Sequence, residues 1–300
     1  MSLEYVIKGE NIEKKFKGFT LNIPELKIPK GFATALIGEN GAGKSTLMNV
    51  LAGIRLDAKG TIRYFDEYDQ VEREKGNQKE RVGYVGPGPY YLPQWTVGQV
   101  EEVSEIMFEG FHKDRFENWC QELAVYGTGT ADKSKKVSSF SDGTKMKLML
   151  ANVLARDTEA LILDEPASPL DPLMREKLCE MIQEYLEEGN GERSVFFSTH
   201  NVSDMENITD YAIIMEHGQI VEEGFVVDLK EKYILVKGDA EDKDNVKDVL
   251  YTMTANNYGF EGICLAENLD KLAGMNITKE IPSLYQISVA VMKANSMMGR

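Results

Sequence analysis

A glycine-rich stretch, GENGAGKST at residues 38–46, constrains the fold of this chain more than any other part of the sequence. It begins at the last residue of FATALIG (32–38), a short and almost continuous apolar run that is typical of a strand buried on both faces. After it, Leu47, Val50 and Leu51 recur at helical spacing, and Gly53 can end that helix. A strand that turns directly into a helix presents backbone N–H groups and the positive end of the helix dipole, which together favour phosphate binding.

The residues of this stretch match the pattern G-x-x-x-x-G-K-[ST], which binds the phosphates of nucleotides. Gly38 and Gly43 are its two defining glycines. Lys44 would contact the β- and γ-phosphates, and the Ser45 hydroxyl would ligate Mg²⁺. The alternative is a glycine-rich turn that binds nothing, and the strand and helix on either side argue against it.

Acidic residues follow a second buried strand. The run ALIL at residues 160–163 leads into Asp164 and Glu165. An acidic side chain at such a strand end can hold Mg²⁺, and its neighbour can position a water for attack on the γ-phosphate. His200 follows a third buried strand, SVFFST, and could reach the same phosphate and water. The structural alternatives are a helix-capping Asp-Glu pair and a histidine without a catalytic role.

Strands that alternate with helices favour an α/β fold, in which helices cover a mostly parallel sheet. One such helix should begin at Asp171 and Pro172, an N-cap residue and a proline at the first helical position, and should end at Gly189.

Two other parts of the chain have different patterns. The first thirty residues alternate between apolar and polar positions, which predicts antiparallel strands with turns at Gly9 and Gly18. The segment of about 87–150 begins with prolines and glycines and continues in helical patterns, so we expect a mostly helical insertion. A two-residue hairpin turn is predicted at His217-Gly218.

Composition excludes some functions. The chain has 34 basic and 49 acidic residues and a net charge of −15, which argues against nucleic acid as a partner. Its 3 cysteines are far apart in the sequence and fit neither a disulfide framework nor a zinc site, which favours the cytoplasm. We expect a soluble chain, because no apolar run approaches the length needed to span a bilayer.

Five short motifs follow one another in a fixed order: GENGAGKST, FSDGT, LILDEP, ASPLD and STH. In this order they resemble the Walker A, signature, Walker B, D-loop and switch-histidine motifs of the ATP-binding subunits of ABC (ATP-binding cassette) transporters. The resemblance covers about residues 3–225. It implies a P-loop NTPase core with an N-terminal antiparallel β subdomain and an α-helical signature subdomain, ATP and Mg²⁺ as ligands, and Glu165 and His200 as catalytic residues.

The signature FSDGT, residues 140–144, departs from the usual LSGGQ at Asp142 and Thr144. In the family, two subunits pair head-to-tail, and the signature of one covers the ATP bound by the other. Without the resemblance, the sequence predicts only that Ser141 is the N-cap residue of a helix. The resemblance assigns Mg²⁺ to Ser45 and Asp164. It assigns ATP to Phe16, Gly38, Asn40, Gly41, Ala42, Gly43, Lys44, Ser45, Thr46, Ser141 and Gly143.

The sequence leaves two assignments open. The aromatic residue that stacks on adenine is Phe16, with Phe19 as the alternative. The glutamine of the family's Q-loop aligns with Pro87, and Gln94 follows seven residues later.

Beyond residue 228 the resemblance narrows to ATPases that serve ABC-2-type exporters of bacteria. The expected domains are therefore an ATP-binding domain at 1–228 and a small α/β accessory extension at 229–300. Their usual Pro-Thr-Leu-Glu-Asp-Ile appears here as PSLYQI, without the two acids. In this last segment Leu284, Ile287 and Val291 form a helical stripe that should dock on this chain or on a partner.

The expected function is that of an ATP-hydrolysing subunit that powers a membrane exporter. It would pair with a second ATP-binding subunit and bind permease subunits at the cytoplasmic face of the membrane. One alternative is a soluble ABC ATPase that acts on ribosomes or DNA. Another is a poorly catalytic partner subunit, suggested by the unusual Q-loop and signature.

Overall fold

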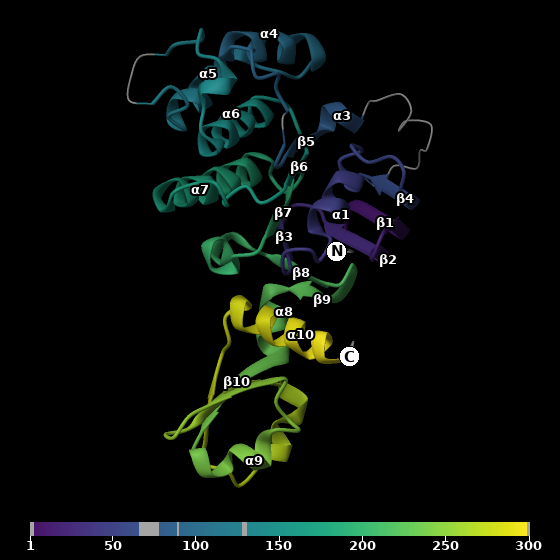
Figure 1. Ribbon diagram of the computed structural model, residues 1–300, viewed down its shortest axis with the longest axis vertical. Helices are drawn as coiled ribbons and strands as arrows, with labels where there is room; N and C mark the ends of the chain where they lie inside the picture. The colour runs from purple at the N-terminus through teal and green to yellow at the C-terminus, as the bar shows by residue number, and fades with distance from the viewer. Residues whose placement is uncertain (1–2, 66–77, 89, 128–130, 299–300) are drawn as a thin grey trace. The chain divides into compact units, whose positions relative to one another are not determined.

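The computed structural model describes residues 3–65, 78–88, 90–127 and 131–298 (Figure 1). The chain forms two compact units, one of residues 1–34 with 45–199 and one of residues 35–44 with 200–300. The main sheet has six strands in the order β5-β6-β7-β3-β8-β9. This architecture confirms the α/β prediction.

The elements of the first unit are β1 (Tyr5–Phe16), β2 (Phe19–Pro29), α1 (Lys44–Leu51), β4 (Lys59–Tyr64), α3 (Gln78–Arg81), β5 (Val82–Val85), α4 (Val97–Met107), α5 (Lys113–Glu122), α6 (Asp142–Leu154), β6 (Ala160–Leu163), α7 (Pro172–Glu188) and β7 (Ser194–Thr199). The elements of the second are β3 (Ala33–Ile37), which begins in the first unit, β8 (Tyr211–Glu216), β9 (Gln219–Phe225), α8 (Val226–Lys232), β10 (Tyr233–Gly238), α9 (Lys243–Val246), β11 (Thr252–Ala255), β12 (Phe260–Leu265), β13 (Ile277–Glu280) and α10 (Leu284–Met298).

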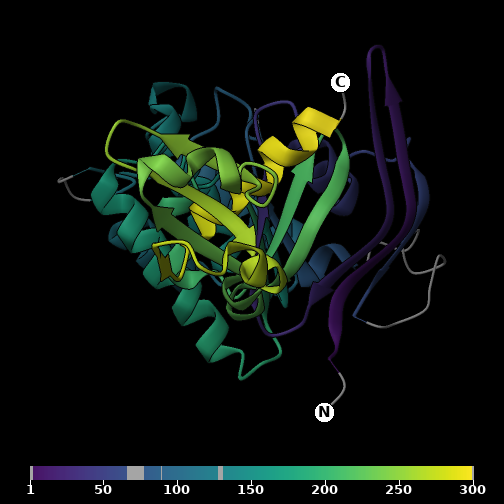
Figure 2. The same ribbon diagram turned by 90° about the horizontal axis from the view of Figure 1, so that it is seen from below.

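The N-terminal strands form a separate antiparallel sheet of order β2-β1-β4, and Figure 2 shows its long β1–β2 hairpin. The predicted turn at Gly18 is confirmed, with φ at 86°. The predicted turn at Gly9 is wrong, because Gly9 lies inside β1 and pairs with Leu26 and Ile62. Its lack of a side chain serves packing instead, since a Cβ there would lie 2.6 Å from Ile12.

Parallel pairing joins β5 to β6 and β6 to β7. Every residue of β6 and β7 is buried, which explains why their sequences are apolar runs without alternation. Helix α7 packs on β7 and begins and ends as predicted. The Asp171 carboxylate accepts a hydrogen bond from the Met174 N–H, 3.1 Å away, and Gly189 is the C-cap.

The cap of α7 gives a stability prediction. Asp171→Ala should lower the free energy of unfolding by about 1 kcal/mol, because one amide at the start of the helix loses its acceptor. Urea unfolding measures this, and Gln183→Ala, in the exposed middle of the same helix, is the control. Equal midpoints for both variants would contradict the assigned cap.

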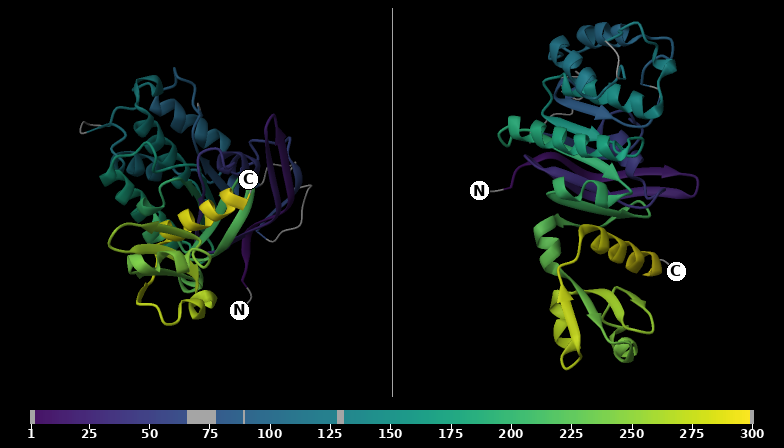
Figure 3. Two further views of the ribbon diagram at one scale, coloured as in Figure 1. Left: turned by 60° about the horizontal axis from the view of Figure 1, so that its bottom comes forward. Right: turned by 90° about the vertical axis from the view of Figure 1, so that its left-hand side faces the viewer.

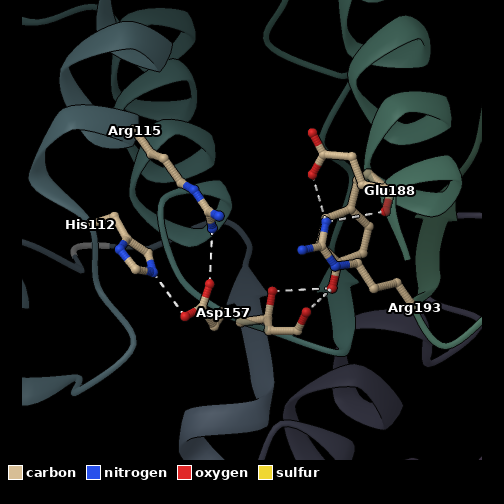
Figure 4. A network of polar contacts seen from close by, with 7 residues as sticks. His112, Arg115, Asp157, Glu188 and Arg193 are labelled. Atoms are coloured by element: carbon tan, nitrogen blue, oxygen red, sulfur yellow. Dashed lines mark hydrogen bonds and ion pairs between the residues drawn. The ribbon is translucent and has the colours of Figure 1, made fainter. Parts of the chain in front are cut away.

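Helices α4, α5 and α6 group together in Figure 1, which confirms a mostly helical segment. A network of polar contacts connects this group to the segment before β6 and to α7 (Figure 4). The Asp157 carboxylate, just before β6, accepts from His112 at 2.8 Å and from Arg115 at 2.9 Å. The next residue, Thr158, accepts from the Tyr185 hydroxyl of α7 at its carbonyl, 2.8 Å away. The segment 157–158 therefore joins α5 to α7.

In the second unit, His217 and Gly218 have positive φ angles of 48° and 80°, which confirms the hairpin turn between β8 and β9. A four-stranded antiparallel sheet of order β11-β12-β10-β13 follows (Figure 3). The chain enters it through α8, within which the expected domain boundary at 228 falls.

The apolar stripe of α10 docks on this chain. Leu284, Ile287 and Val291 are buried, and the helix packs on β8, β9 and α8. The carboxylate of Glu206 accepts from the Leu284 N–H at 2.9 Å and from Lys230 at 2.9 Å, and so caps the helix. The stripe is therefore internal packing.

Candidate functional site

The phosphate-binding loop, residues 38–44, joins β3 to α1. Gly41 and Gly43 have φ angles of 92° and 106°, in the left-handed region that favours glycine. The Lys44 ammonium is buried and donates to the carbonyls of Gly38 at 2.7 Å and Glu39 at 3.3 Å. The loop thus closes around its own lysine, and a phosphate could take the place of these carbonyls.

The remaining residues assigned to ATP in this stretch differ in exposure. Asn40 and Ser45 are exposed, and Thr46 is half-buried on the first turn of α1. Ala42 is buried, and its carbonyl accepts from the Gly218 N–H at 2.9 Å. Ser45 is therefore accessible to a metal ion. Ala42 connects the loop to the β8–β9 turn through this hydrogen bond.

A buried carboxylate lies directly after β6, and only one of its two oxygens has a hydrogen-bond partner among the described residues. The Asp164 side chain is 0% exposed. Its Oδ1 accepts from the Ser198 hydroxyl at 2.7 Å, and its Oδ2 has no hydrogen-bond partner among the described residues. A buried carboxylate oxygen is costly without a partner, so a bound cation is the natural complement. The residues present therefore fit Mg²⁺.

Glu165 has an unusual backbone. Its φ angle is 51°, a left-handed backbone conformation that residues other than glycine seldom adopt. Residues in this conformation are concentrated at functional sites. Its N–H donates to the hydroxyl of Ser198 at 2.9 Å. Ser198 therefore fixes both acidic residues, one through its carboxylate and one through its backbone.

Sequence reasoning missed Ser198. No local sequence pattern indicates it, because only the register of β7 with β6, in which Phe197 pairs with Leu163, puts Ser198 level with Asp164. His200 is exposed directly after the same strand.

The signature lies at the start of α6. Ser141 is exposed, and its hydroxyl accepts from the Thr144 N–H at 3.2 Å. A Cβ at Gly143 would lie 2.7 Å from the Pro169 carbonyl oxygen, so the D-loop leaves no room for a side chain. The Asp142 carboxylate forms a 3.0 Å ion pair with Lys145, which offsets its charge at this exposed helix end.

The two aromatic candidates lie at the β1–β2 turn, with ring centroids 6.1 Å apart. The Phe16 side chain is 39% exposed, and the Arg55 guanidinium lies 5.2 Å from its ring centroid. Phe19 is half-buried. Phe16 therefore presents more of its ring and stays our prediction for adenine.

The segment after β5 passes beside Asp164. A Cβ at Gly86 would lie 3.0 Å from the Cβ of Asp164, and Pro87 follows in an exposed position. Gln94 is also exposed. The segment therefore runs where the Q-loop alignment expects it, although Pro87 has neither a side-chain oxygen nor an amide hydrogen to offer.

Pro87→Gln should lower the magnesium concentration needed for half-maximal ATPase activity, because the new amide oxygen can replace a metal-bound water. Gln94→Ala should change that concentration little if water fills the position, and should raise it if Gln94 reaches the metal. If neither substitution shifts the magnesium dependence, Pro87 does not occupy the Q-loop position.

A strand, a glycine-rich loop closed on a lysine, and an acid pair whose first member is buried define a P-loop ATPase. The family model described as "ABC transporter" matches residues 21–168. The ABC transporter ATP-binding protein YxlF of Bacillus subtilis, itself named as uncharacterized, is 30% identical over 237 residues, which cover 77% of this chain and 73% of YxlF. The lantibiotic transport ATP-binding protein SrtF of Streptococcus pyogenes is 30% identical over 69% of this chain and 85% of SrtF.

A solved ATP-binding subunit of an ABC transporter shares the fold, with a TM-score of 0.64 and 21% identity over 75% of this chain and 92% of that chain. The chain belongs to the ATP-binding proteins of ABC transporters. The resemblance inferred from the five motifs is thus confirmed. The protein binds ATP, and the hydrolysis of this ATP drives transport. Subunits of this family dimerise and work with membrane permeases. Within the described part of this chain, no helix has the length and apolar character to cross a bilayer.

Proposed function

We propose that this chain is the catalytically competent ATPase of a membrane exporter, with Mg²⁺ held by Ser45 and Asp164. The observation that carries the proposal is the acid pair: a buried Asp164 oxygen lacks a described partner, and the adjoining Glu165 is held in a left-handed conformation by Ser198. A subunit that only binds nucleotide would need the Asp164 ligand for Mg²⁺ but not a fixed Glu165 beside it. In this assignment Glu165 accepts the proton of the attacking water, and His200 contacts the γ-phosphate.

Lys44 binds the β- and γ-phosphates within its own chain. Mg²⁺, when bound, offsets the charge that develops on the phosphate oxygens. Ser141 and Asp142 at the start of α6 are exposed, so this helix end is accessible to a nucleotide held by a second chain. A γ-phosphate contacted by Lys44 of one subunit and Ser141 of the other would stabilise the closed dimer, and hydrolysis would release it.

The partners proposed are a second ATP-binding subunit and permease subunits of the exporter, which would place the chain at the inner face of the cell membrane. SrtF, named for lantibiotic transport, supports a transport role. At the C-terminal end of α4, Ile106 and Met107 are 84% and 62% exposed. Exposed apolar side chains of this kind are typical of a docking surface, and we assign them to a permease. We assign the extension at 229–300 to the accessory segment of ATPases that serve ABC-2-type exporters.

Co-expression with a candidate permease tests this function. The tagged chain should copurify with the permease from detergent-solubilised membranes and hydrolyse ATP in that complex. Ile106→Glu should abolish copurification, whereas Val227→Glu, at an exposed site on α8, should not. A complex without turnover would instead favour the poorly catalytic partner subunit. ATPase activity that persists without any permease binding would favour a soluble, non-transport ABC ATPase.

A further inference from the structure

Two tyrosines lie near Asp164 and have no part in the mechanism above. Tyr84 of β5 pairs in parallel register with Ile162 of β6. Because side chains alternate along a strand, Tyr84, Ile162 and Asp164 project from the same face of the sheet. The Asp164 N–H donates to the Val85 carbonyl at 2.7 Å, which continues this pairing to the level of Asp164.

Gly86 leaves the space in which the Tyr84 hydroxyl lies. A Cβ at Gly86 would be 2.4 Å from the Tyr84 Oη and 3.0 Å from the Cβ of Asp164. The phenol therefore folds back over Gly86, next to the buried carboxylate. Any larger residue at position 86 would displace the ring or the strand end.

The Tyr84 hydroxyl also reaches α1. It donates to Oδ1 of Asn49, 3.1 Å away. Asn49 lies four residues after Ser45 on the same helix, so the two share one helical face. Tyr84 thus connects the helix that carries Ser45 to the strand end that carries Asp164.

Tyr90 supports the Tyr84 ring from the loop beyond Pro87. The two ring centroids are 5.7 Å apart with a tilt of 58°. Tyr90 therefore packs on the ring that lies beside Asp164, in a segment where Pro87 supplies no polar group.

We propose that Tyr84 is a positioning residue of the magnesium site. Through Asn49 it fixes α1 against the end of β5, so that Ser45 and Asp164 can ligate one ion, and Tyr90 holds the Tyr84 ring in place. This inference rests on the metal site proposed above and adds the contact that sets its geometry.

Mn²⁺ serves as the probe, and electron paramagnetic resonance measures its binding to the full chain with ADP present. Tyr84→Phe keeps the ring but loses the bond to Asn49, and should weaken Mn²⁺ binding by about tenfold. Its ADP affinity in EDTA should be unchanged. Tyr233→Phe, which removes a hydroxyl bonded to Glu222 at 2.6 Å in the second unit, should bind Mn²⁺ like the parent.

Asn49→Ala should show the same loss as Tyr84→Phe, and the double variant should lose no more than either single one, because both remove the same contact. Parent-like Mn²⁺ binding by Tyr84→Phe, or additive losses in the double variant, would overturn the inference while leaving the metal site intact. Absence of ADP-dependent Mn²⁺ binding in the parent chain would overturn the metal site, and this inference with it.

Discussion

Glu165→Gln should lower ATP turnover by about 10²–10⁴-fold while ATP binding persists. The amide cannot accept the proton of the attacking water, yet it keeps the size of the side chain and the hydrogen bond from the Glu165 N–H to Ser198. The variant should therefore accumulate as an ATP-bound dimer. Steady-state phosphate release and nucleotide-binding titration measure the two effects.

Asp164→Asn and Glu184→Gln separate this role from its alternatives. Asp164→Asn should weaken the magnesium dependence of nucleotide binding, because it alters the proposed ligand itself. Glu184→Gln, at an exposed site on α7, should leave turnover unchanged. Normal turnover in Glu165→Gln would show that Glu165 has no role in the reaction and only forms part of the connection between β6 and α7.

Ser141→Arg should abolish ATP-dependent dimerisation while monomer ATP affinity stays nearly intact. The guanidinium is too large for a nucleotide interface at the start of α6, but the exposed site has room for it in the monomer. Size-exclusion chromatography of the variant in a Glu165→Gln background, with ATP and Mg²⁺, measures the dimer. The effect should be the loss of the dimer peak.

Ser138→Arg is the matched control, since Ser138 is exposed three residues earlier and lies outside α6. It should dimerise like the parent. Loss of monomer ATP affinity in Ser141→Arg would point to a role within its own chain or in folding. In that case the hydroxyl would act only as the N-cap that accepts from Thr144.

Local sequence patterns predicted much of the fold because few conformations satisfy them. An apolar run without alternation becomes a buried parallel strand, as β6 does, and Asp171-Pro172 starts α7. The phosphate-binding loop was equally predictable, since its glycines allow positive φ angles at Gly41 and Gly43.

Features that depend on partners distant in sequence were not predictable from local patterns. Gly9 is typical of a turn, and only its pairing with Leu26 of β2 and Ile62 of β4 shows that it lies inside a strand. Ser198 and Tyr84 become part of the site only through the register of β7 and β5 with β6. The burial of the α10 stripe likewise requires β8, β9 and α8 to be in place.

A structure of Glu165→Gln with ATP and Mg²⁺ tests the central claim most directly, that ATP is hydrolysed in a site shared by two chains. The account predicts a head-to-tail dimer. The γ-phosphate should contact Lys44 of one protomer and, within hydrogen-bonding distance, Ser141 of its partner. A nucleotide whose γ-phosphate is contacted only by residues of its own chain would contradict the account.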